Sequence, residues 1–254
     1  TEGQRVVVRH AEMLNPDGTL YTTNLRSAKA TDTYYLSGES ERDYEPYFTF
    51  HGFRYVEVTG LDYTPQSQDV TGVVVYSDLP RTGRFTCSEP LVNQLVENTV
   101  RGQKGNFLDV PTDCPQRDER AGWTGDAQVF MKTACLNLDS PAFFTKWLID
   151  LCQDSQREDG ALGDVAPHIG VVGFGNTGWG DAGVVCNWRM YEMYGDLDVV
   201  RHHYPALKRY WDYLQRTSDD HTRGTGAYGD WLRLAGPQHS EVIGTAYYFY
   251  VTRL

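Results

Sequence analysis

The residue types best suited to chemistry gather in one stretch, Asp109 to Asp126, with the sequence DVPTDCPQRDERAGWTGD. Pro111 and Pro115 remove backbone donors and disfavour helix in the residues before them. The stretch is therefore predicted to be a long loop that leads into a helix. Loops this dense in ionisable side chains usually carry function.

Three acids of this loop, Asp113, Glu119 and Asp126, are too far apart for helix periodicity to align them. Only a folded loop can bring them together, and like charges held close would push at least one pKa upward. A carboxylic acid needs a raised pKa to donate a proton near neutral pH. The alternative is a solvated loop in which Arg117 and Arg120 neutralise the acids.

Three Trp residues in loops each have Gly and Asp beside them, at Gly122–Asp126, Gly178–Asp181 and Gly229–Trp231. A Trp that packs a helix interior does not need these neighbours. Trp123, Trp179 and Trp231 therefore predict an aromatic-lined, acidic cleft, because an indole offers a flat apolar face with one polar N–H.

The composition limits the classes of partner. The chain has 254 residues, a net charge of −11 and no run of Lys or Arg, so nucleic acids and anionic membranes are poor partners and a neutral ligand fits better.

The five cysteines of the chain, at positions 87, 114, 135, 152 and 186, lack CxxC spacing and are predicted to be free thiols, with no disulfide scaffold or zinc site. No apolar run could span a bilayer and Thr1 opens no signal peptide, so the compartment stays open. The start without Met suggests a cut N-terminus.

Residues 1–86 are predicted to be β structure. Strands are expected at Val6–Val8, at Pro46–Leu61 with a bulge or turn near Gly52, and at Val70–Tyr76, with a turn at Asn15–Gly18. Short strands separated by turns indicate an antiparallel sheet or sandwich. His51, inside the strongest segment, is expected to be structural and to bond a neighbouring backbone group.

Residues 87–254 are predicted to be helical. Six helices are expected: one capped by Ser88 with an apolar face through Val100, and others from about Asp126, Ser140-Pro141, Asp181 to Tyr194, Leu197 to Thr217 with a kink or break at Pro205, and near Glu241. Successive helices without intervening strands indicate stacked α-hairpins, and the long loops between them would decorate one end of the stack.

The run DVPTDCPQRDERAGWTGDAQVF resembles the signature of bacterial α-L-rhamnosidases of glycoside hydrolase family 78. The resemblance continues in FTFHGFRYVEV, in GWGDAGVV at 178–185, in YGDW at 228–231 and in IGTAYYFYVTRL at 243–254. It implies an antiparallel β-sandwich segment followed by part of an (α/α)6 barrel. It further implies hydrolysis of terminal α-L-rhamnose, with inversion, from small-molecule or polysaccharide glycosides. Neither a cofactor nor a metal is implied, and self-association stays open.

The resemblance also implies roles for individual residues. Glu119 matches the general acid, with Asp118 as its rival, and Asp113 and Asp126 match carboxylates that hold the sugar and steady its developing charge. The further substrate contacts implied are Arg117, Trp123, Trp179, Asp181 and Trp231.

The implied mechanism needs a general base, and no residue of this chain is assigned to that role. An inverting glycosidase needs a second carboxylate to activate water, and in the resembled family that base lies in the later half of the barrel. Glu241 is not assigned to this role, so the chain is expected to be a fragment. Three alternatives stay open: a similar glycosidase for another sugar, a non-catalytic carbohydrate-binding protein, and a metal-dependent hydrolase that uses the clustered Asp residues.

Overall fold

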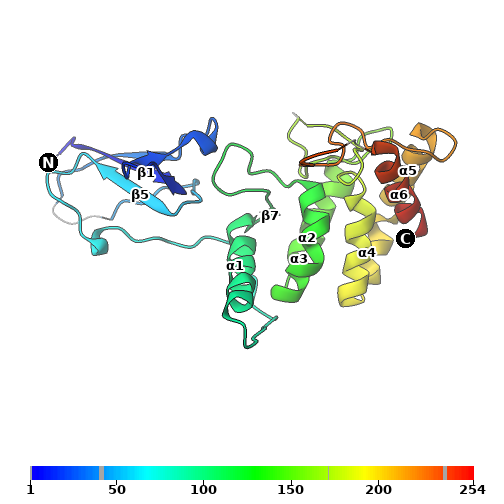
Figure 1. Ribbon diagram of the computed structural model, residues 1–254, viewed down its shortest axis with the longest axis horizontal. Helices are drawn as coiled ribbons and strands as arrows, with labels where there is room; N and C mark the ends of the chain where they lie inside the picture. Colours follow the sequence, from blue (N-terminus) through cyan, green and yellow to red (C-terminus); the bar gives the residue numbers. More distant parts are fainter. Residues whose placement is uncertain (1, 40–42, 171, 237–238) are drawn as a thin grey trace. The chain divides into compact units, whose positions relative to one another are not determined.

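The computed structural model describes residues 2–39, 43–170, 172–236 and 239–254. The chain divides into two compact units (Figure 1). The β unit combines Thr1–Tyr76 with Cys114–Arg120, and the helical unit combines Ser77–Asp113 with Ala121–Leu254. Antiparallel β structure followed by helices confirms the predicted fold class.

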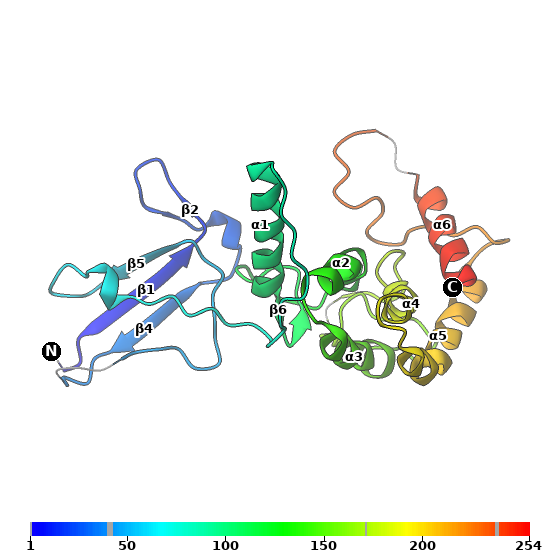
Figure 2. The ribbon, with the colours of Figure 1, turned by 90° about the horizontal axis from the view of Figure 1, so that it is seen from below.

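The β unit is built on a three-stranded antiparallel sheet with the order β4-β1-β5 (Figure 2). The central strand β1 (Arg5–Ala11) pairs with β4 (Thr31–Tyr35) and with β5 (Tyr55–Thr59). The predicted turn at Asn15–Gly18 joins β2 (Met13–Leu14) to β3 (Leu20–Tyr21). The unit also contains two short 3-10 turns, η1 (Thr23–Leu25) and η2 (Ser67–Asp69).

Two of the strand predictions are wrong: one strand is shorter than predicted, and the other does not form. Only β5 forms within Pro46–Leu61, and Val70–Tyr76 contains no strand. Val73 and Val74 are 74% and 75% exposed, and no strand in the described ranges pairs with their segment. Apolar and β-branched residues favour extended backbone, but a strand also needs a neighbour with which to exchange hydrogen bonds.

Gly52 does not mark a bulge inside a strand. Its N–H donates to the carbonyl of Pro115 at 3.2 Å, and a Cβ at this position would lie 2.9 Å from Pro115 Cγ. The missing side chain therefore lets the segment Cys114–Arg120 approach the rest of the β unit closely.

His51 bonds a side chain, so the prediction of a backbone partner is wrong. Its Nε2–H donates to both carboxylate oxygens of Asp32 at 3.0 Å, and its ring stacks on His10 with centroids 4.3 Å apart. His10 Nδ1–H donates to the carbonyl of Ala30 at 3.1 Å. Burial lowers the pKa of His10, so the neutral ring is the stable form inside the unit.

Within its described residues, the helical unit has six helices close to their predicted ranges: α1 (Pro90–Asn106), α2 (Thr124–Asn137), α3 (Pro141–Ile149), α4 (Ala182–Tyr194), α5 (Leu197–Thr217) and α6 (Ser240–Arg253). α3 continues into a π-helical turn, η3 (Asp150–Asp154), and a small hairpin pairs β6 (Phe107–Leu108) with β7 (Val110–Pro111). The N-cap of α1 is Glu89, whose carboxylate accepts from Leu91 N–H at 3.0 Å, and not the predicted Ser88. α5 runs through Pro205 without interruption.

The apolar core of the unit lies among the helices. Trp147 and Phe144 of α3, Met131 of α2, Met190 of α4 and Tyr210 of α5 are fully buried there. The long segments after η3 and after α5 gather at one end of α2, α3 and α4 (Figure 1). Hydrogen bonds link the two segments, among them Thr177 N–H to the carbonyl of Thr225 at 3.1 Å.

The predicted apolar face of α1 is largely uncovered within the described chain. Leu91 and Leu95 are 78% and 64% exposed, whereas Val100 and Gln103 are buried. Among the helices that the structure describes, none has both the length and the apolar character that crossing a bilayer requires.

The buried His10 predicts that acid destabilises the β unit. Its pKa is lower in the folded than in the unfolded chain, so stability is complete above about pH 6.5, the ordinary histidine value, and falls below it as the unfolded chain takes up the proton. The urea midpoint of the wild type should therefore drop between pH 7.5 and 5, and His10→Gln should reduce that drop. The exposed His221, replaced in the same way, is the control. An identical drop in the wild type and His10→Gln would contradict the assignment.

Candidate active site

The acid loop, Cys114–Arg120, is closed at its base by two hydrogen bonds of the helical unit. Asp113 N–H donates to the carbonyl of Ala121 at 3.2 Å, and Ala121 N–H donates to Asp113 Oδ1 at 3.1 Å. The chain thus leaves the helical unit at Asp113 and re-enters it at Ala121, and the seven residues between them pack with the β unit.

Glu119 lies within this loop and is held by two guanidinium groups. Arg117 Nη2 lies 2.7 Å and Arg26 Nη1 lies 3.0 Å from the same oxygen, Glu119 Oε2. Arg120 has another role, because its Nη1–H donates to the carbonyl of Phe50 at 2.8 Å. The neutralising contact expected of an arginine is thus made by Arg117 and, from a distant part of the chain, by Arg26.

Asp118 differs from Glu119 in its partners. The hydroxyl of Ser27 and the Ser27 N–H, the latter at 3.2 Å, both donate to Asp118 Oδ2. The hydroxyl bond, strongest among the causes, holds the pKa of Asp118 below its usual range.

In the helical unit, Asp113 and Asp126 line one cavity. It has a volume of about 390 Å³ and lies between α1 and the start of α2. Asp126 stands in the first turn of α2, where the helix dipole favours a negative charge. Two of the three predicted acids are therefore brought together within this unit.

The three predicted Trp residues gather around one residue that the sequence reasoning missed, Tyr228. Its ring centroid lies 5.8 Å from that of Trp123, 4.4 Å from Trp179 and 5.9 Å from Trp231. We call these four side chains the aromatic cluster. The YGDW motif contains Tyr228, but the spacing of the Trp residues gave no reason to choose it.

The polar groups of the aromatic cluster differ in whether they have a hydrogen-bond partner. The indole N–H groups of Trp123 and Trp179 are buried and have no hydrogen-bond partner. The hydroxyl of Tyr228, in contrast, donates to the buried Asp164, and burial raises the pKa of Tyr228 to about 12. Unpaired buried donors are rare in folded proteins, and they often mark a functional site.

Asp164 supports the aromatic cluster by accepting the hydrogen bond from Tyr228. Its carboxylate is fully buried and accepts from Asn176 N–H at 3.2 Å and from the Asn176 side-chain amide. Burial raises the pKa of Asp164. Its main-chain carbonyl also accepts from Thr124 N–H at 3.0 Å, which ties the segment to the start of α2.

Asp181 makes hydrogen bonds inside the helical unit. It is buried, its Oδ2 accepts from Gly178 N–H at 2.8 Å, and its Oδ1 accepts from the Tyr210 hydroxyl at 2.9 Å. These hydrogen bonds help to hold the loop that carries Trp179. The role of Asp181 as a substrate contact stays a prediction.

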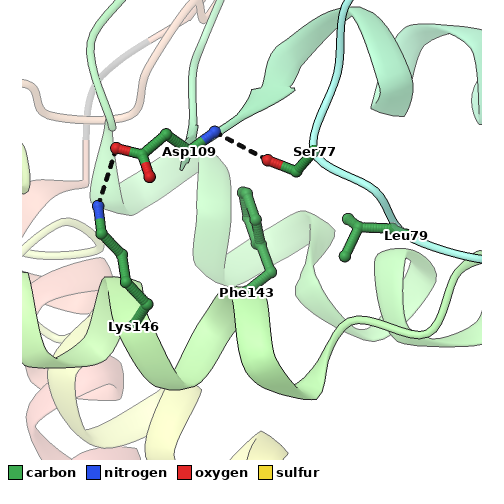
Figure 3. Close-up of a pocket in the computed structure, with 5 residues that line it drawn as sticks. All are labelled: Ser77, Leu79, Asp109, Phe143 and Lys146. Carbon is green, nitrogen blue, oxygen red and sulfur yellow. Dashed lines mark hydrogen bonds and ion pairs between the residues drawn. The ribbon is translucent and has the colours of Figure 1, made fainter.

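A second cavity, of about 200 Å³, lies beside the β6–β7 hairpin (Figure 3). Asp109 N–H donates to Ser77 Oγ at 2.9 Å, and Asp109 Oδ2 pairs with Lys146 Nζ at 3.1 Å. Asp109 adopts a left-handed conformation with φ of 66°, which Asp tolerates better than most residues. The first acid of the motif therefore shapes a turn, and none of the predicted site residues lines this cavity.

His10, Asp32 and His51 form one of two described groups that could offer ligand atoms to a metal, because such atoms lie within 4.8 Å of one another; the other is Asp113, Cys114 and Glu119. Zinc binds a ring nitrogen at about 2.0–2.1 Å along its lone pair, and so near the ring plane. The two rings are stacked at an interplanar angle of 27°, so they face each other and do not converge on one point. The cluster is better suited to hydrogen bonding than to metal binding.

Two families of known proteins match the chain. The family described as the bacterial α-L-rhamnosidase six-hairpin glycosidase domain matches residues 80–254, and the bacterial α-L-rhamnosidase concanavalin-like domain matches residues 1–76. An α-L-rhamnosidase of Streptomyces avermitilis is 52% identical over 97% of this chain and 24% of its own length. One of Formosa agariphila is 41% identical over 99% of this chain and 28% of its own length.

A solved structure of an α-L-rhamnosidase is also similar to this chain. The crystal structure of the Streptomyces avermitilis α-L-rhamnosidase complexed with L-rhamnose superposes with a TM-score of 0.96 at 50% identity, and covers 100% of this chain and 24% of that one. The chain thus spans about a quarter of the length of these relatives.

The packing of Trp179 predicts that Gly125 tolerates no side chain. A Cβ at Gly125 would lie 2.7 Å from Trp179 Cε2, so Gly125→Ala must displace the indole and should cost about 1–3 kcal/mol of stability. Gly102→Ala in α1 is the matched control, because its added Cβ meets nothing within 4 Å, and it should stabilise the helix by up to about 1 kcal/mol. Thermal unfolding measures both changes. Equal effects of the two substitutions would argue against the packing described.

Proposed function

Because this chain belongs to the bacterial α-L-rhamnosidase family, we propose that the protein containing it removes terminal α-L-rhamnose from rhamnosides by hydrolysis. The aromatic cluster carries this proposal. L-Rhamnose has a methyl group where a hexose has a hydroxymethyl group, and an apolar wall of Trp123, Trp179 and Trp231 suits that methyl and one face of the ring.

Glu119 is proposed as the general acid, which protonates the glycosidic oxygen as the bond breaks. Two observations support this choice: Glu119 matches the acid of the family motif, and Asp118 already accepts hydrogen bonds from the hydroxyl and the N–H of Ser27. The hydrogen bonds of Asp118 favour a different role, which is to fix the conformation of the loop.

Asp113 and Asp126 are proposed to accept hydrogen bonds from the sugar hydroxyls and to stabilise positive charge at the anomeric carbon. Their position on one cavity supports a shared ligand. Carboxylates near a developing oxocarbenium ion stabilise it more than they stabilise the neutral substrate, which is the condition for lowering the barrier. Arg117 is proposed as a further polar contact with the sugar.

Inversion is proposed as the stereochemical course. It requires a base placed roughly 6.5–9.5 Å from the acid to activate water on the opposite face of the sugar. No residue of this chain is assigned to that role. Residues 87–254 are proposed to form the N-terminal part of the barrel that holds the sugar, with residues 1–86 as the adjoining β segment.

Hydrolysis of a nitrophenyl α-L-rhamnoside by the complete gene product that contains this chain tests the proposal. Glu119→Gln should lower kcat/KM by several orders of magnitude, because the leaving oxygen then departs without a proton. NMR should show the anomer of inverted configuration as the first product. Glu57→Gln is the matched control, because Glu57 also pairs with an arginine of the β unit, Arg9, at 2.9 Å.

Other outcomes point to other functions. If the Glu119→Gln variant keeps most of its activity, the acid is elsewhere, with Asp118 and Asp113 as the next candidates. Preferential hydrolysis of a glucoside or uronide would indicate a related glycosidase for another sugar. Rhamnose binding without turnover would indicate a carbohydrate-binding protein.

A further inference from the structure

Asp164 is joined by hydrogen bonds to the loops that carry Trp123 and Trp179. Its main-chain carbonyl accepts from the N–H and from the hydroxyl of Thr124, both at 3.0 Å, and Thr124 directly follows Trp123. Its Oδ1 accepts from Asn176 N–H at 3.2 Å, and its Oδ2 accepts from the Asn176 side-chain amide. The carbonyl of Asn176 in turn accepts from Trp179 N–H at 3.0 Å, so two successive bonds connect Asp164 to the backbone of Trp179.

The loop that carries Trp231 is joined to the same carboxylate in two ways. The Tyr228 hydroxyl donates to Asp164 directly. Ala227 N–H donates at 2.7 Å to Oδ1 of Asn176, whose amide nitrogen bonds Asp164. The loops of all three Trp residues therefore meet at one buried side chain.

The bridge between Asp164 and Asn176 is closely packed. A Cβ at Gly173 would lie 2.8 Å from Asp164 Oδ2 and 2.8 Å from Asn176 Nδ2, and a Cβ at Gly226 would lie 2.1 Å from Asn176 Oδ1. Glycine at these two positions lets the backbone approach the bridge where any side chain would collide with it. A bridge enclosed in this way leaves its neighbours little freedom to move.

The fully buried carboxylate of Asp164 depends on these donors. Burial raises its pKa, whereas the hydrogen bonds from Asn176 and Tyr228 favour the ionised form and oppose that rise. Water cannot replace a donor that a buried carboxylate loses, so the loss is more costly than at the surface. The Tyr228 hydroxyl is therefore firmly held at Asp164.

Tyr228 transmits this constraint to the indoles. Its ring centroid lies 4.4 Å from that of Trp179, 5.8 Å from that of Trp123 and 5.9 Å from that of Trp231. Aromatic rings at these distances pack in preferred orientations. Because one end of Tyr228 is fixed by Asp164 and its ring packs against all three indoles, a shift of Tyr228 must displace the aromatic cluster.

We propose that Asp164 is a positioning residue for sugar binding: it holds Tyr228 and the three Trp loops, so that the aromatic cluster keeps the shape that receives the sugar. This rests on the proposed function, which assigns the aromatic cluster to the rhamnose. Asp164 lies outside the motif that supplies the acids, and it acts on the sugar only through the residues that it holds.

The steady-state kinetics of the complete gene product on a nitrophenyl α-L-rhamnoside test the inference. Tyr228→Phe removes one hydroxyl and should raise KM about three- to tenfold, the range expected for one lost hydrogen bond. It should change kcat little, because the aromatic cluster binds the ground state and the transition state alike. Asp164→Asn removes more of the bridge and should raise KM further.

Tyr194→Phe is the matched control. The Tyr194 hydroxyl also makes a hydrogen bond in the helical unit, which it accepts from Ser140 N–H at 3.4 Å. Tyr194 ends α4, whereas Trp179 precedes its start, so a helix about 20 Å long separates the control from the aromatic cluster. This variant should leave both KM and kcat unchanged.

An unchanged KM in Tyr228→Phe would overturn the inference, whether or not kcat falls. A lower kcat alone is the result expected if the substitution only reduces the amount of folded enzyme. A rise in KM of the same size in Tyr194→Phe would overturn the inference too, since the effect would then not depend on the bond to Asp164. If Asp164→Asn does not fold, the two tyrosine variants still decide the question.

A spectroscopic readout separates this inference from the proposed function. Closely packed indoles give a coupled circular-dichroism band, and the contribution of the aromatic cluster is the difference between the wild-type gene product and Trp179→Phe. Asp164→Asn keeps all four rings of the cluster and should lose much of that contribution. Its loss in a protein that hydrolyses no rhamnoside would refute the proposed function and leave the positioning standing. An unchanged band would refute the positioning, whatever the activity.

Discussion

The two hydrogen bonds between Asp113 and Ala121 are the constraint on which the arrangement of the acids depends. They bring the ends of the acid loop together, so the seven residues between them leave the helical unit and return at almost the same point. Asp113 uses its backbone N–H and one carboxylate oxygen for this closure. The same residue thus fixes the loop and lines the cavity that it shares with Asp126.

The two units impose different environments on their acids. In the β unit, Glu119 and Asp118 are partly exposed and meet donors or cations, which stabilise charge. In the helical unit, Asp164 and Asp181 are buried and satisfied by hydrogen bonds, and burial raises the pKa of both. The buried pair holds the loops that carry the aromatic cluster, whereas the other pair is partly open to solvent.

The sequence predicted local features well, because these depend on neighbouring residues. Pro141 and Gly195 mark helix ends, and α4 and α5 begin within a residue of their predicted starts. Prediction from the sequence failed where a strand or a side chain depends on partners that are far away in the sequence. Val70–Tyr76 has the composition of a strand but no described pairing partner, and His51 bonds Asp32, which no local pattern could indicate. Arg26 and Tyr228 were missed for the same reason, since each is defined by contacts with distant segments.

The dependence of rate on the leaving group tests most directly the claim that Glu119 protonates the departing oxygen. An alkoxide is a poor leaving group and needs that proton, whereas fluoride or a dinitrophenolate departs without a full proton transfer. Glu119→Gln should slow hydrolysis of a methyl α-L-rhamnoside by several orders of magnitude more than hydrolysis of the activated dinitrophenyl substrate. An equal loss on both substrates would show that Glu119 is not the proton donor and acts in another way.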